Sequence, residues 1–68
     1  MDGVVTAFDD AAGLGTVTAD DGTPFPFHCT QIAGGGRTIA VGTAVAFDVR
    51  PWHRGRYEAT AVTPRSGS

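Results

Sequence analysis

The chain has 68 residues, of which 41% are hydrophobic and 18% are charged, and its formal net charge is −2. A chain of this length has room for one hydrophobic core, and its composition excludes an intrinsically disordered chain, which would be less apolar and more charged. The single cysteine, Cys29, excludes an internal disulfide framework. Because no long apolar run and no basic N-terminal block are present, we expect no membrane span, no signal peptide and a cytoplasmic protein.

The charges are distributed unevenly along the chain. Residues 1–34 contain five Asp and no Lys or Arg, whereas residues 35–68 contain five Arg with only Asp48 and Glu58. Electrostatic affinity for nucleic acid comes from clustered positive charge. An acidic chain is therefore not a general phosphate binder, and any such binding has to come from a local patch.

Five short segments have the composition of β-strands. No window shows a helical period of 3.6 residues, and ten Gly with four Pro leave little room for long helices. Val, Thr and aromatic residues concentrate in residues 3–8, 14–19, 25–29, 44–49 and 57–63. The Asp21-Gly22 pair is a strong hairpin signal and predicts that the second and third strands pair.

The later part of the chain predicts a long connection and a half-buried strand. We expect at most one helical turn at residues 30–32 within the connection over residues 30–43. In the fourth strand Val45, Phe47 and Val49 share one face, which is the period-two pattern of a strand with one buried side. Pro26 cannot donate a ladder hydrogen bond, so the third strand is expected at a sheet edge.

These elements predict an all-β fold, a five-stranded antiparallel Greek-key barrel of the oligonucleotide-binding type (OB-fold), because closure removes exposed strand edges. We expect one domain over residues 1–63 and a flexible polar tail over residues 64–68.

Several segments resemble the bacterial cold-shock domain. Residues 12–17 (AGLGTV) and 25–28 (FPFH) are similar to its two ribonucleoprotein motifs, K-G-F-G-F-I and V-F-V-H-F. Residues 3–9 resemble its first strand. Its central landmarks are matched by residues 36–39, 42 and 45–47. Its closing R-G and A-x-x-V motifs are matched by residues 54–55 and 59–62. The resemblance covers residues 3–62 and implies a cold-shock-like barrel. It places these residues in the core: Val4, Val17, Phe25, Phe27, Ile32, Val45, Phe47 and Val62.

The ligand face that this resemblance implies has lost most of its aromatic residues. In the family, unpaired bases stack on aromatic residues of the first three strands, and such stacking contributes about 1–3 kcal/mol per base. Here the positions of Lys, Trp and several Phe hold Thr6, Ala7, Leu14, Thr16, Pro26, Cys29 and Gly36. Only His28 remains, with Phe8 at the margin, so binding at this face is expected to be weak.

Residues 50–57 (RPWHRGRY) contain the cationic and aromatic residues that the strand face lacks. They hold three Arg, the only Trp, the only Tyr and one His, and interleaved cations and aromatics suit a single strand or an acidic partner. One interpretation is that ligand contacts have shifted to this loop. The other is that Trp52 and Tyr57 pack over the barrel end and the arginines are solvated.

Catalytic and metal sites are not expected. His28 and Cys29 adjoin in a predicted strand, where neighbours point to opposite faces, and the cysteine and two histidines lack a zinc spacing. Asp9-Asp10 and Asp20-Asp21 lie in turns, where Asp usually bonds its own backbone. The sequence therefore predicts no enzyme, no metal and no cofactor.

Two functions remain open. The first is a cold-shock-like protein that binds single-stranded RNA or DNA weakly and with little sequence preference. Its predicted interface comprises Phe8, Leu14, Thr16, His28, Arg37, Trp52, His53, Arg54, Arg56 and Tyr57. The alternative is an OB-fold protein-interaction module that has lost nucleic-acid binding and contacts a protein or a second copy of itself, through the Trp52 loop or the surface of Leu14, Thr16 and Pro26.

Overall fold

The computed structural model describes residues 1–34, 36, 38–51 and 55–65. It contains five strands and one short 3₁₀ helix, η1. The elements are β1 (Asp2–Asp9), β2 (Leu14–Ala19), β3 (Pro24–His28), η1 (Cys29–Gln31), β4 (Ala44–Pro51) and β5 (Tyr57–Pro64). The all-β class and the five strands predicted from the sequence are confirmed, with boundaries shifted by at most two residues.

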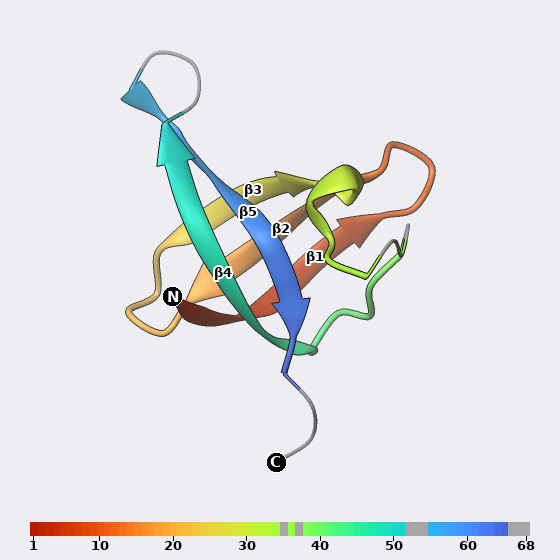
Figure 1. Ribbon diagram of the computed structural model, residues 1–68, viewed down its shortest axis with the longest axis horizontal. Coiled ribbons are helices and arrows are strands. Elements are labelled where there is room, and N and C mark those ends of the chain that lie inside the picture. The colour runs from red at the N-terminus through yellow and green to blue at the C-terminus, as the bar shows by residue number, and fades with distance from the viewer. Residues whose placement is uncertain (35, 37, 52–54, 66–68) are drawn as a thin grey trace.

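The strands form one antiparallel sheet in the order β3-β2-β1-β4-β5 (Figure 1). The β2–β3 pairing predicted from Asp21-Gly22 is present, and β3 lies at a sheet edge, as Pro26 predicted. The sheet curls so that the residues following β3 reach β5: Ala33 N donates to Val62 O at 2.7 Å. This closure gives the barrel-like Greek-key fold expected of the OB type.

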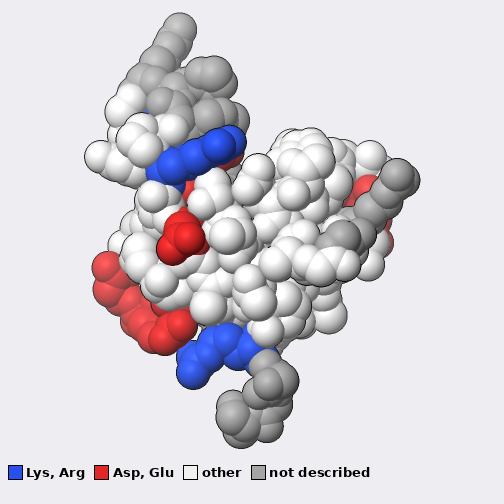
Figure 2. Space-filling model, viewed as in Figure 1, with Lys and Arg blue, Asp and Glu red and all other residues white. Residues whose placement is uncertain are grey.

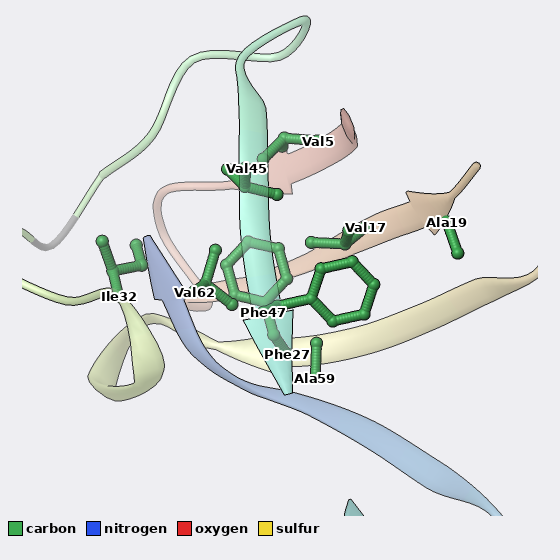
Figure 3. Packing of buried hydrophobic residues seen from close by; sticks show 9 residues of the cluster. All are labelled: Val5, Val17, Ala19, Phe27, Ile32, Val45, Phe47, Ala59 and Val62. Carbon is green, nitrogen blue, oxygen red and sulfur yellow. The ribbon is translucent and has the colours of Figure 1, made fainter. Parts of the chain in front are cut away.

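The core consists of side chains that all point to the inside of the curled sheet (Figure 3). Its buried members are Val5, Val17, Ala19, Phe27, Ile32, Val45, Phe47, Ala59 and Val62. Phe25 is half-buried and lies with its ring centroid 5.8 Å from that of Phe47. Val45 and Phe47 are buried and Val49 half-buried, which confirms the predicted face of the fourth strand.

The prediction that Val4 belongs to the core is wrong. Val4 is 38% exposed, whereas its neighbour Val5 is fully buried. Gly3 and Val5 take the inward positions of β1, which turns Val4 outward. The register with β2 then shifts between Val5 and Ala7, so that Thr6 and Ala7 are both exposed. This bulge breaks the period of two that identifies an inward face from sequence.

At the other end of the sheet, β5 continues through Pro64, and Arg65 N donates to Ala44 O at 2.8 Å. The Arg65 guanidinium lies 3.6 Å from the Asp2 carboxylate. Backbone contacts with the sheet therefore extend to residue 65.

Candidate nucleic-acid interface

The outward face of β1–β3 is mostly uncharged at its centre, where Asp9 is the one charged residue that lines it. A shallow depression there, the strand-face depression, is lined by Ala7, Phe8, Asp9, Leu14, Gly15, Thr16 and Pro26. Leu14 is 52% exposed and Thr16 is half-buried. In Figure 2, acidic side chains gather over the β2–β3 turn. The face offers apolar contact but little charge to attract phosphate.

Phe8 has a double role on this face. It is half-buried, and its ring stacks on Phe27 with centroids 6.0 Å apart and planes 18° apart. Gly15 lies directly against this pair, because a Cβ there would lie 2.6 Å from Phe27 Cζ. Phe8 therefore offers only part of its ring to a ligand, since the rest packs on the core.

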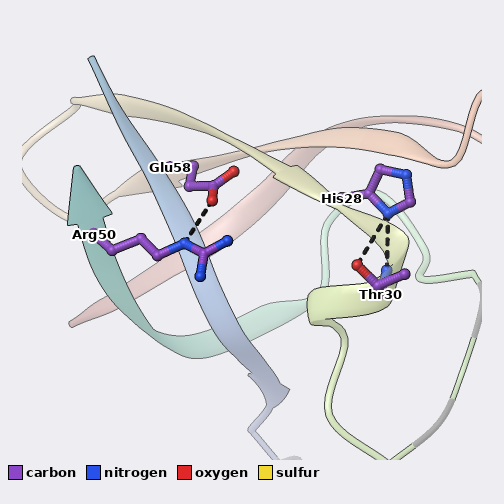
Figure 4. A network of polar contacts seen from close by, with 4 residues as sticks. All are labelled: His28, Thr30, Arg50 and Glu58. Carbon is purple, nitrogen blue, oxygen red and sulfur yellow. Dashed lines mark hydrogen bonds and ion pairs between the residues drawn. The ribbon is translucent and has the colours of Figure 1, made fainter. Parts of the chain in front are cut away.

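His28 is held in a defined orientation at the end of β3. Its Nδ1 accepts the Thr30 backbone N–H at 3.2 Å and lies 3.1 Å from Thr30 Oγ1 (Figure 4). A ring nitrogen that accepts a backbone N–H carries no proton, so the neutral ring has its hydrogen on Nε2. The exposed His28 ring can therefore stack on a base and donate through Nε2.

The prediction that His28 and Cys29 are neighbours in one strand and point to opposite faces is wrong. Cys29 does not continue β3 but begins η1, and its Sγ lies 3.8 Å from His28 Nδ1. The strand ends at His28 because the ring caps the 3₁₀ turn that follows. Cys29 is half-buried and packs against the core.

The β4–β5 end of the barrel meets β3 at a cleft of about 310 Å³, the loop cleft. One wall comes from β3 and the preceding turn, and the other from the start of β5. Its residues are Thr23, Pro24, Phe25, Pro26, Arg56 and Tyr57. Arg56 and Tyr57 are both exposed. The structure thus brings two of the predicted loop residues against the strand that carries His28.

The remaining predicted interface residues, Arg37, Trp52, His53 and Arg54, lie outside the described part of the chain.

A second cleft, of about 240 Å³, contains a buried acidic residue that was not predicted from the sequence. This Glu58 cleft is lined by Leu14, Gly15, Pro26, Phe27, His28 and Glu58. Glu58 is 9% exposed, and its Oε1 accepts a hydrogen bond from Arg50 Nε at 2.6 Å (Figure 4). The one signal in the sequence is that Glu58 is the only glutamate of the chain. The structure places it opposite Arg50 in the β4–β5 register.

Two of the four turn aspartates, Asp9 and Asp21, accept backbone hydrogen bonds, as predicted. Asp9 Oδ1 accepts from the backbone N–H groups of Ala11 and Ala12, and Asp21 Oδ1 accepts from that of Thr23. The bond from Thr23 lowers the pKa of the Asp21 carboxyl below its ordinary value. These carboxylates therefore stabilise turns.

Within the described ranges, no three His, Cys, Asp or Glu side chains lie close enough together to hold a metal ion. Of the helical segments that the structure describes, none is long and apolar enough to cross a membrane.

A search of curated proteins found no match to the chain. The family model described as the 'Cold-shock' DNA-binding domain matches residues 1–65. The chain therefore belongs to the cold-shock domain family, a nucleic-acid-binding family whose members bind single strands.

Proposed function

We propose that this protein binds single-stranded RNA or DNA weakly and with little sequence preference. The interface comprises Phe8, Leu14, Thr16 and His28 on the strand face with Arg56 and Tyr57 at the loop cleft. Arg37, Trp52, His53 and Arg54 belong to the same proposal on sequence grounds. The observation that carries it is the position of Pro26, which lines the strand-face depression, the loop cleft and the Glu58 cleft alike. A single strand can therefore pass across β3 from one hollow to the next.

Weak binding follows from the number of stacking partners. Among the described residues, His28 and Tyr57 are exposed rings and Phe8 is half-buried. Two stacked bases contribute about 2–6 kcal/mol at about 1–3 kcal/mol each. The upper half of this range, about 4–6 kcal/mol, corresponds to a dissociation constant between about 40 µM and 1 mM.

Low sequence preference follows from the chemistry of the same groups. Every base has a π-face, so stacking is tolerant of sequence. Leu14 and Pro26 offer only apolar contact, which cannot read a hydrogen-bonding edge. The arginine guanidinium of Arg56 suits phosphate, which carries no sequence information.

A protein-interaction module is the second candidate, and one observation favours it. The strand-face depression has Asp9 as its one charged lining residue and exposes Leu14, on a chain whose net charge is −2. Salt separates the two functions. Binding to a single strand weakens with salt at a slope of about −0.7 per phosphate contact, whereas an apolar protein contact does not.

The test is a titration with heptathymidine and with a mixed-sequence RNA heptamer at low salt, followed by the fluorescence of the only tryptophan. We expect saturable binding that weakens with salt, and a loss of about threefold to tenfold in Arg56→Ala. Arg65→Ala is the matched control, because it also removes one exposed arginine but lies beside Asp2 at another end of the sheet. No binding up to 1 mM by a folded protein, or equal losses in both variants, would contradict the proposal.

A further inference from the structure

The Glu58 carboxylate lies in an unusual setting for a nucleic-acid interface. Glu58 is nearly buried, and the other residues of its cleft supply apolar or aromatic walls from β2 and β3. Acidic side chains are rarely buried unless they are paired. A buried ion pair is also weak evidence for stability, because apolar residues of similar volume often stabilise as well. Its position in a cleft of the interface suggests a role in recognition.

Arg50 makes this carboxylate compatible with an anionic ligand. Its Nε donates to Glu58 Oε1 at 2.6 Å, while the Arg50 side chain remains 59% exposed. The pair is neutral overall, so the carboxylate does not repel a phosphate backbone as an isolated charge would. A carboxylate has about four lone-pair sites, and the bond to Arg50 uses one of them.

The chemistry of the cleft selects among the bases. A carboxylate only accepts hydrogen bonds, so it favours a base edge with adjacent donors. Guanine presents N1–H and N2–H side by side, whereas uracil presents one N–H between two carbonyl oxygens, which a carboxylate repels. The apolar wall formed by Leu14 and Pro26 suits the flat face of a base.

We propose that the Glu58 cleft takes a guanine base of a bound single strand, with the Glu58 carboxylate accepting from N1–H and N2–H. Arg50 then acts as a positioning residue that orients the carboxylate through Nε. This inference rests on the proposed function, since the base arrives as part of a strand that crosses β3. It makes one subsite selective within an otherwise unselective interface.

The test compares three RNA heptamers that differ only at the central base: all-uridine, uridine with a central guanosine, and uridine with a central inosine. A good pair of hydrogen bonds to a base edge discriminates by about fivefold to 150-fold. We expect the guanosine heptamer to bind at least fivefold more tightly than the all-uridine one. Inosine, which lacks the N2 amino group, should fall between them.

Glu58→Gln should reduce the preference for the guanosine heptamer over the all-uridine one to within about twofold. Asp48→Asn is the matched control: it makes the same charge change at an exposed position on β4, and it should keep the preference. Circular dichroism establishes that each variant is folded, and the wild-type comparison decides the question even if Glu58→Gln does not fold.

The outcomes separate the two proposals. Binding of all three heptamers with equal affinity by the wild type would overturn the guanine subsite and leave the proposed function standing. A preference that survives in Glu58→Gln would overturn the role of the carboxylate. No binding of any heptamer would overturn the proposed function and this inference with it.

Discussion

Replacing Gly15 with alanine tests the close packing beneath the strand-face depression. The added methyl carbon would lie 2.6 Å from Phe27 Cζ and 2.8 Å from Phe8 Cδ1. Ordinary contacts between carbon atoms are about 3.5–4.0 Å. Phe27 is 2% exposed and its ring stacks on that of Phe8. The two rings therefore cannot make room without disturbing the core.

The expected loss of stability is that of an overpacked core, about 1–3 kcal/mol. In a domain of this size each kcal/mol lowers the melting temperature by about 4–8 °C. At the middle of that range, about 2 kcal/mol, Gly15→Ala should melt roughly 8–16 °C below the wild type. Thermal and urea unfolding, followed by far-ultraviolet circular dichroism, measure this difference.

Gly36→Ala is the matched control. A Cβ at Gly36 would lie 3.7 Å from Thr38 O and 3.8 Å from Ile32 Cγ2, which are ordinary contacts. Its stability should stay within about 0.5 kcal/mol of the wild type. If Gly15→Ala proves as stable as Gly36→Ala, the two aromatic rings are not held as described and the reasoning is refuted.

Three further predictions concern the polar contacts. Arg50→Ala leaves the nearly buried Glu58 without this partner, so the free energy of unfolding in urea should fall by about 1–3 kcal/mol, between the values for exposed and buried pairs; an unchanged value would contradict the ion pair. The bond from Thr23 lowers the pKa of Asp21, so the carboxylate stabilises the fold above its unfolded-state pKa and loses this contribution as the pH falls through the lowered value. Asp21→Ala should therefore have a lower free energy of unfolding than the wild type at pH 7, and this difference should narrow as the pH falls below 3.8. A difference that does not change with pH would refute this prediction. Nitrogen-15 spectra should show neutral His28 protonated at Nε2, and a proton on Nδ1 would contradict its bond to the backbone.

The sequence predicts the strands well because Gly, Pro and Asp-Gly pairs mark their ends. The β2 strand has the predicted boundaries, Leu14–Ala19, and the others differ by one or two residues. The inward face of β1 was not predictable from the Val4-Val5 doublet, since either valine could point inward. The bulge that follows depends on pairing with β2, which is a tertiary property.

The candidate site was predictable only in part. The strand-face residues follow from the resemblance to the cold-shock family, residue by residue. The clefts do not, because each joins β3 to residues about thirty positions later in the chain, and such contacts arise only when the sheet curls. Glu58 is the clearest case: its pairing with Arg50 depends on the β4–β5 register, and its approach to the cleft of His28 depends on the curl of the sheet.

The prolines of β3 limit how a protein partner could bind. Five residues of β3 pair with β2, and Pro24 and Pro26 lie opposite Thr18 and Thr16. Because a proline cannot donate a ladder hydrogen bond, the N–H groups that bond β2 belong to Phe25 and Phe27. Successive N–H groups of a strand point to opposite edges, so the backbone nitrogens at positions 24, 26 and 28 face the outer edge. Only His28 among these three has an N–H, so an added strand would find almost no donors along this edge. A protein that binds this side of the molecule must therefore contact side chains of the strand face. A single-stranded nucleic acid would use the same side chains, so the two ligands should compete.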